Sequence, residues 1–351
     1  MASAHRNTLS KLLLAWRILW RLAILYGVFL LLKRVAEQSG ADLSAAFRTA
    51  SPLPILAALL LYGFVQVLGA WRWRLLLTVQ NVSLTLVSAF RLTLMANFFS
   101  QLIPGSVSGD ALKIAIAAAE FTKQKAEITF TILLDRILGL SGLFLAAALT
   151  TCLSFGTVRT LATQHQALRY GLWAVNLGCL GTLAAALCFA CRPQLTALCR
   201  VLRLTDLWQR LVGLLPPRLR NFCGRLDRAL EKYRPRQGIL LAHLGVSTVI
   251  HLCCGLCLFL LGRGLHEASL TPLQYSVTMQ VANASAIVPL APGGFGLRDT
   301  ITATFLQAFR ISPPETAGTI PLAYSAVILA WALVGAAIFC LSPKIRNCKQ
   351  G

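Results

Sequence analysis

The sequence predicts an all-α polytopic membrane protein. Of its 351 residues, 56% are hydrophobic and only 13% are charged, and the mean hydropathy is +0.68. Several apolar runs approach the roughly 20 residues that a helix needs to cross a bilayer, and no ordinary soluble domain fits this composition. We therefore expect a single integral membrane domain over residues 1–351, with about six spanning helices and two re-entrant broken-helix hairpins in an inverted repeat.

The expected spanning helices follow the apolar runs. They lie near 13–32, 53–71, 127–150, 169–191, 239–262 and 318–341. The first is not expected to be a cleaved signal peptide, because Lys33-Arg34 closes it and no small-residue cleavage site follows. The run Trp71-Arg72-Trp73-Arg74 ends the second, and we expect it to anchor that helix at the membrane interface.

The chain is strongly basic, with 33 Lys and Arg against 12 Asp and Glu and a formal charge of +21 at pH 7. On a membrane protein, such an excess more often sets orientation and attracts anionic headgroups than it binds nucleic acid. No RNA-binding module of interleaved aromatic and basic residues is visible. Membrane phospholipids are therefore expected partners, and nucleic acid is not.

The sizeable polar segment 192–237 holds eleven of the Lys and Arg residues. The positive-inside rule places it in the cytoplasm. Apolar residues recur there at roughly helical spacing with Arg200, Arg203 and Arg210 between them, which indicates an amphipathic helix on an anionic leaflet. A solvated loop that only fixes topology is the competing interpretation.

Two further segments, 84–120 and 272–310, are apolar helices interrupted by a Pro/Gly break. Residues 83–97 and 269–283 match at five of fifteen positions. If each spanning helix reverses the side and each broken segment enters and leaves on one side, both termini are cytoplasmic. The two segments are then hairpins that enter from opposite sides, within repeats over about 53–150 and 239–341.

A Pro/Gly break frees backbone groups that lipid cannot satisfy, so each break must be buried or line a wet cavity. The helices that follow begin near Asp110 and near Arg298-Asp299, and their N-termini favour an anion such as phosphate. Simple helix capping is the competing role for the two acids. The candidate substrate-binding residues of the two hairpins are Asn97, Gln101, Pro104, Gly105, Gly109, Asp110, Lys113, Asn283, Pro292, Gly293, Gly294, Gly296, Arg298 and Asp299.

Asp135-Arg136 lies inside the otherwise apolar run 127–150. Each charge costs about 2.5–3.5 kcal/mol at a helix centre, so we add both residues to the candidate substrate-binding site. A structural ion pair with Lys113 or Asp110 is the alternative. His251 could relay protons, although a lone histidine on a helix face is more often packed or hydrogen-bonded.

The sequence supports no enzymatic chemistry, and we expect no catalytic residues, metal or cofactor. Cys188/Cys191 and Cys254/Cys257 have C-x-x-C spacing, but both pairs fall in apolar helices without accompanying His or carboxylate ligands. There is no Gly-rich nucleotide loop, nucleophile elbow or H-E-x-x-H motif. An integral-membrane transferase that uses Asp110 or Asp135 as a base stays open as a third interpretation.

Several motifs occur together along the chain. They are Gly69–Leu77 around Trp71-Arg72-Trp73-Arg74, the stretch from Asn97 through Ile103-Pro104-Gly105 to Gly109-Asp110 and Lys113, the pair Asp135-Arg136, and Pro292 to Asp299. In combination they resemble the lysylphosphatidylglycerol synthase transmembrane, or flippase-like, family over roughly residues 15–340. The resemblance implies a bacterial or archaeal cytoplasmic-membrane protein. In the bifunctional members such a bundle moves aminoacylated phosphatidylglycerol between leaflets.

The chain departs from the family pattern in three motif positions. Ser108-Gly109-Asp110 replaces the usual Gly-Gly-Asp, Lys113 replaces Arg, and Asp299 replaces Glu. The soluble acyltransferase-like domain that performs aminoacyl transfer in the synthases is also expected to be absent. Because Lys binds phosphate as a point charge and Arg clamps it bidentately, the headgroup could differ from that of better-known members.

These observations predict a lipid flippase or translocase of the cytoplasmic or inner membrane. Its expected substrate is an anionic or aminoacylated phospholipid or a lipid-linked headgroup. The alternative is a non-catalytic scaffold that binds lipid and recruits a lipid-modifying or glycosyl-transferring enzyme through 192–237. A lipid-modifying enzyme and a second copy of the chain are thus further candidate partners.

Overall fold

Four long apolar helices form the frame of the bundle. They are α3 (Pro52–Val79), α6 (Lys125–Leu153), α12 (Gln237–Gly264) and α15 (Thr316–Leu341). The computed structural model describes residues 48–102, 108–120, 124–164, 166–190, 228–229, 231–285 and 296–341, and within these ranges the regular structure is helical throughout. All four helices are long and apolar enough to cross a membrane, the third together with the preceding 3-10 turn η1 (Arg234–Arg236). The predicted all-α polytopic membrane fold is therefore confirmed.

The predicted spans near 53–71, 127–150, 239–262 and 318–341 lie within these four helices. The segment predicted over 169–191 is helical as α8 (Gln166–Ala190), which follows the short α7 (Phe155–Gln164). The helix predicted over 13–32, both termini and most of the basic segment 192–237 lie outside the described residues.

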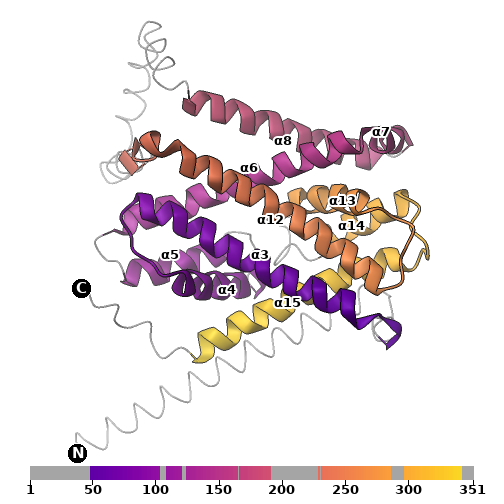
Figure 1. The fold of residues 1–351 in the computed structure, drawn as a ribbon, viewed down its shortest axis with the longest axis horizontal. Coiled ribbons are helices and arrows are strands. Elements are labelled where there is room, and N and C mark those ends of the chain that lie inside the picture. Colours follow the sequence, from indigo (N-terminus) through magenta and orange to yellow (C-terminus); the bar gives the residue numbers. More distant parts are fainter. Residues whose placement is uncertain are drawn as a thin grey trace, which may run out of the picture.

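The two interrupted segments form two pairs of shorter helices. These are α4 (Leu86–Leu102) with α5 (Ser108–Glu120), and α13 (Pro272–Ser285) with α14 (Leu297–Ala308). Short links join each pair to the long helices before and after it, so each pair starts and ends at one end of the bundle. Figure 1 shows α4 and α5 toward the left end, and α13 and α14 toward the right end.

The repeated Ser-Leu-Thr sequence has a local physical role, because its threonine caps the helix that follows. The Thr85 hydroxyl accepts the N–H of Ser88 at 3.2 Å before α4. Before α13, the Thr271 hydroxyl accepts the N–H of Gln274 at 3.4 Å, and Gln274 Oε1 accepts the N–H of Thr271 at 2.8 Å. Such caps satisfy backbone donors that a helix start leaves free, so both pairs begin in the same way.

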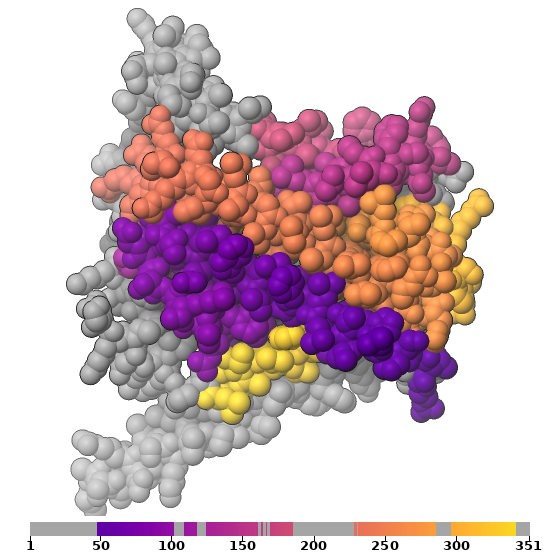
Figure 2. Space-filling view, in the orientation of Figure 1, coloured from indigo at the N-terminus to yellow at the C-terminus, as the bar shows by residue number. Residues whose placement is uncertain are grey.

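The helices pack in matching ways around α3 and α12, which lie side by side across the face seen in Figures 1 and 2. The first short pair packs through α4 on α15, and the second packs through α13 on α6. Each short pair therefore rests on the last long helix of the other half. Buried apolar side chains fill the main core between them, including Leu258, Leu261, Tyr275, Ile320 and Ile328.

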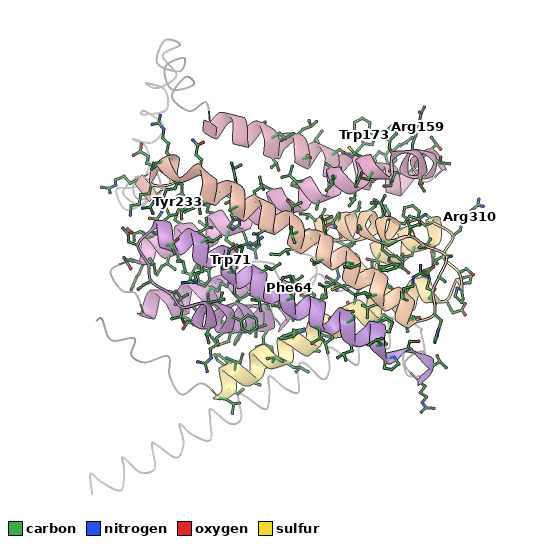
Figure 3. The ribbon with its side chains drawn as sticks, in the orientation of Figure 1. Phe64, Trp71, Arg159, Trp173, Tyr233 and Arg310 are labelled. Carbon is green, nitrogen blue, oxygen red and sulfur yellow. The ribbon has the colours of Figure 1, made fainter. Side chains whose placement is uncertain are left out.

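The outer surface of several helices is apolar. On α3, Leu60 and Phe64 are 62% and 51% exposed, and on α8, Trp173 and Leu177 are 67% and 66% exposed. Figure 3 shows Phe64 and Trp173 on these two helices. In water such surfaces would be costly, whereas in a bilayer they face hydrocarbon. The exposed apolar faces agree with a multi-pass membrane protein.

The prediction that Trp71-Arg72-Trp73-Arg74 anchors a helix end at the interface is wrong for its two central residues. The helix does not end at Trp71 but continues to Val79, so the run lies inside α3. Trp73 is buried at 1% exposure, and Arg72 turns into the bundle, where its side chain is 15% exposed. Trp71 keeps 37% exposure. Only one face of this run can reach the outside, because consecutive helical residues point in different directions.

Candidate functional site

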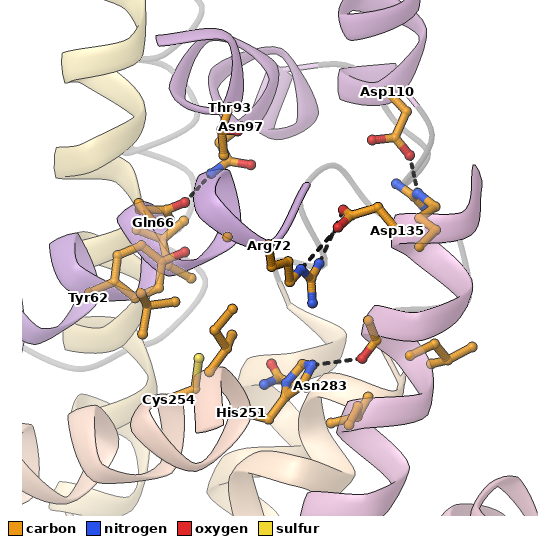
Figure 4. A pocket seen from close by; sticks show the side chains of 18 of the residues that line it. Tyr62, Gln66, Arg72, Thr93, Asn97, Asp110, Asp135, His251, Cys254 and Asn283 are labelled. Atoms are coloured by element: carbon orange, nitrogen blue, oxygen red, sulfur yellow. Dashed lines mark hydrogen bonds and ion pairs between the residues drawn. The ribbon is translucent and has the colours of Figure 1, made fainter. Parts of the chain in front are cut away.

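A polar cavity of about 430 Å³ lies between the helices of the bundle, with walls from both halves. Its polar and charged lining residues are Tyr62, Gln66, Arg72, Thr93, Asn97, Asp110, Lys113, Asp135, Arg136, His251, Asn283, Arg298 and Tyr324. Figure 4 shows ten of its lining residues labelled, from both halves of the chain. A cluster of charges between apolar helices is costly to maintain, so it points to a functional role.

The Arg72 guanidinium connects three long helices. Its Nε and Nη2 donate to the two carboxylate oxygens of Asp135 on α6, at 3.1 and 3.3 Å, and its Nη1 donates to Ser247 Oγ on α12 at 2.8 Å. His243 of α12 is fully buried, and its Nε2 lies 2.8 Å from Asp135 Oδ1. Gly139 leaves the space for this guanidinium, because a Cβ there would lie 2.9 Å from Arg72 Nη2.

A second ion pair joins α5 to α6, between Asp110 and Arg136. It is more exposed than the first, with side-chain exposures of 20% for Asp110 and 41% for Arg136. The structure thus divides the adjacent residues Asp135 and Arg136 between two different partners. The alternative of a structural ion pair holds for Arg136, whose partner is Asp110, whereas Asp135 pairs with Arg72.

Lys113 of α5 lines the cavity with its ammonium over an aromatic ring. The side chain is 8% exposed, and its Nζ lies 4.6 Å from the centroid of the Trp73 ring. Such a cation–π contact contributes about 0.5–2 kcal/mol, more when it is desolvated. The burial of Trp73 therefore has a role in the site, because this indole positions the Lys113 ammonium.

The second short pair brings Arg298 to the cavity from α14. Its Nη2 lies 3.2 Å from Asp299 Oδ1 and donates to Ser325 Oγ at 2.6 Å, and its guanidinium carbon lies 5.3 Å from the Tyr324 ring centroid. Ser325 Oγ in turn donates to Asp299, at 2.9 and 3.0 Å from the two carboxylate oxygens. Arg298 therefore reaches the cavity while its charge is balanced by a buried acid.

Neutral side chains complete the wall. Asn97 Nδ2 donates to Gln66 Oε1 at 2.6 Å, which joins α4 to α3. His251 Nε2 lies 3.2 Å from the Gly139 carbonyl oxygen, and its Nδ1 is buried without a hydrogen-bond partner. Asn283 of α13 also lines the cavity (Figure 4). These groups can form hydrogen bonds with a polar ligand without changing the charge balance.

A comparison with protein families agrees with this architecture. The family model described as "Lysylphosphatidylglycerol synthase TM region" matches residues 18–336. The chain belongs to this family. A search of curated proteins finds no match. As a member of this family, the chain is a membrane domain linked to lipid handling, and the matched range contains all the described lining residues of the cavity.

The cavity brings together seven of the sixteen residues predicted for the site of this transmembrane region. They are Asn97, Asp110, Lys113, Asp135, Arg136, Asn283 and Arg298. Gln101, Gly109, Gly296 and Asp299 do not line it. The break residues Pro104, Gly105, Pro292, Gly293 and Gly294 lie outside the described residues.

The four residues away from the cavity wall differ in their surroundings. A Cβ on Gly109 would lie 2.3 Å from the Ala96 carbonyl oxygen, so this glycine allows α5 to approach α4. Gly296 precedes α14 with a φ of +85° that side chains rarely adopt, and its N–H lies 3.5 Å from Asp299 Oδ2. Asp299 therefore stands both at the helix start and beside Arg298. The buried Oε1 of Gln101 has no hydrogen-bond partner.

Sequence reasoning missed Arg72, Gln66 and Tyr62 on α3 and Ser325 on α15, and it did not consider His243 or Ser247 on α12. Arg72 was visible as an arginine in an apolar run, but its neighbours suggested an interface. His243 and Ser247 lie four residues apart, on one helix face, which is a usable signal for a polar stripe. Within the described residues, no group of three or more His, Cys, Asp or Glu side chains could hold a metal ion.

Proposed function

We propose that this chain is a lipid translocase of the cytoplasmic or inner membrane. It moves the headgroup of an anionic or aminoacylated phospholipid, or of a lipid-linked compound, while the acyl chains stay in the bilayer. The observation that carries this proposal is the charged cavity of about 430 Å³ inside a bundle with apolar outer faces. A headgroup needs such a polar path, because lipid hydrocarbon cannot solvate charge.

In this proposal the two short pairs are re-entrant hairpins of an inverted repeat. Helix lengths support the repeat: α3 to α6 have 28, 17, 13 and 29 residues, and α12 to α15 have 28, 14, 12 and 26. The reciprocal packing of α4 on α15 and of α13 on α6 supports it too. Broken helices at corresponding places of two repeats are a common way to build a transporter's substrate site. Both termini then lie in the cytoplasm.

A leaflet-exposure assay tests the translocase. The purified chain is reconstituted into sealed liposomes with fluorescently labelled anionic, aminoacylated or polyprenyl-phosphate lipids, and a membrane-impermeant quencher reports outer-leaflet label. We expect accelerated exchange of at least one lipid, and loss of that acceleration in Lys113→Ala and Arg298→Ala. Arg159→Ala is the matched control, because Arg159 is exposed on α7, outside the cavity wall.

The assay also separates the proposal from its competitor. No acceleration for any lipid, with the protein shown to be folded, would contradict the translocase and favour the enzyme-recruiting scaffold. Wild-type exchange in folded Lys113→Ala and Arg298→Ala would contradict the assignment of the cavity as the lipid path.

A further inference from the structure

The charges around the cavity do not cancel. Its wall carries four basic side chains, Arg72, Lys113, Arg136 and Arg298. Each arginine has a carboxylate partner: Asp135 for the first, Asp110 for the second and Asp299 for the third. Within the described part of the chain, no carboxylate lies within 4 Å of the Lys113 ammonium. Counted by formal charge over the described residues, the cavity and its paired acids therefore keep one positive charge, on Lys113.

This remaining charge is both buried and oriented. Lys113 is more than nine-tenths buried, lines the cavity, and lies over the Trp73 ring at 4.6 Å. A ring face compensates an ammonium far less than a carboxylate does, and a buried charge without a counter-ion is costly. The site is therefore complementary to one negative charge.

Resting on the proposed translocase, we infer that the cavity selects a phosphodiester lipid whose headgroup carries a single negative charge and is otherwise neutral. Lys113 is the residue that determines this specificity. A phosphodiester neutralises the remaining positive charge, and the neutral wall groups on Gln66, Asn97 and Asn283 can hydrogen-bond to hydroxyl groups of the head.

The same count of charges disfavours a headgroup that is esterified with lysine. It carries one phosphate and two ammonium groups, so it would bring a net positive charge into a cavity that is already positive. Like charges a few ångströms apart repel, and more strongly between the helices than in bulk water. The structure thus favours the unmodified lipid over the aminoacylated one.

The test compares two lipids that differ only in the headgroup. Trace phosphatidylglycerol or lysyl-phosphatidylglycerol, each labelled on an acyl chain, is placed in phosphatidylcholine liposomes that contain the full-length chain, and an impermeant reductant reports leaflet exchange. We expect phosphatidylglycerol to move about tenfold faster or more, the ratio that loss of one charge-assisted contact gives. Lys113→Gln should lose this advantage, Lys113→Arg should keep it, and Lys113→Glu should prefer the lysyl lipid.

The control is Lys232→Gln, which removes a lysine exposed outside the cavity and should leave both rates unchanged. If the Lys113 variants do not fold, the thermal stabilisation of the wild-type chain by each lipid gives the same ranking. Equal or faster movement of lysyl-phosphatidylglycerol by the wild type, or an unchanged ratio in folded Lys113→Gln, would overturn the inference. If neither lipid moves and neither stabilises the chain, the proposed function itself fails.

Discussion

The two short helix pairs occupy equivalent places in the bundle, but the surroundings of their basic residues differ. In the α4–α5 pair, Lys113 is buried over an aromatic ring without a carboxylate within ion-pair distance among the described residues. In the α13–α14 pair, Arg298 lies beside Asp299, and both contact Ser325. Similar scaffolds therefore carry different electrostatics. The first pair leaves a charge at the cavity without a carboxylate partner among the described residues, and the second holds its charge in a buried network.

The largest expected effect on stability comes from breaking the Arg298–Asp299 ion pair. Asp299→Ala leaves the buried Arg298 guanidinium without its carboxylate, and loss of one partner of a buried ion pair costs about 3–5 kcal/mol. We expect the free energy of unfolding in detergent, measured by denaturant titration, to fall by about 3 kcal/mol or more. If Asp299→Ala lowers the free energy of unfolding by less than Asp110→Asn does, the Arg298–Asp299 ion pair is no more stabilising than the Arg136–Asp110 ion pair.

The close approach of α4 and α5 gives the next effect. Gly109→Ala places a methyl group 2.3 Å from the Ala96 carbonyl oxygen, so the helices must move apart. We expect a destabilisation of about 1–3 kcal/mol by the same titration. Gly318→Ala is a control, because a Cβ there meets nothing within 4 Å. Equal losses in both variants would mean that helix contact is not the cause.

Removal of the Lys113 charge, which has no carboxylate partner among the described residues, should raise the free energy of unfolding. Lys113→Met keeps an apolar stem under the Trp73 ring and removes a buried ammonium, so we expect a gain of about 1 kcal/mol in the free energy of unfolding. Translocation should fall in the same variant. A loss of stability in Lys113→Met would contradict this contrast between the two helix pairs, because it would show that Lys113 stabilises the fold.

The smallest effect is expected at the exposed ion pair. Asp110→Asn removes the partner of Arg136, whose side chain is 41% exposed, and exposed pairs contribute about 0–1 kcal/mol. The melting temperature should therefore change little, and high salt should change it by a similarly small amount. A loss as large as that of Asp299→Ala would require a buried role for Asp110.

The sequence allowed the helix pairs and part of the cavity to be predicted, because both depend on local signals. Apolar runs and Pro/Gly breaks located the broken segments, and basic residues in the helix that follows each break identified Lys113 and Arg298. The partners could not be predicted, since they depend on contacts between distant residues. Asp135 lies 63 residues from Arg72 and 108 residues from His243, and neither spacing leaves a periodic pattern.

Hydrogen bonds join His243 and Ser247 of α12 to Asp135 and Arg72, toward the Gln237 end of that helix. His243 is six residues from Gln237 and 21 residues from Gly264, which correspond to roughly 9 and 31 Å along a helix. The Gly264 end is tied to the first half as well, because the N–H of Ser51, just before α3, donates to the Gly264 carbonyl oxygen at 2.8 Å. α12 is therefore fixed to the first half at two points roughly 31 Å apart along its axis, and we expect the two to move together when the cavity opens.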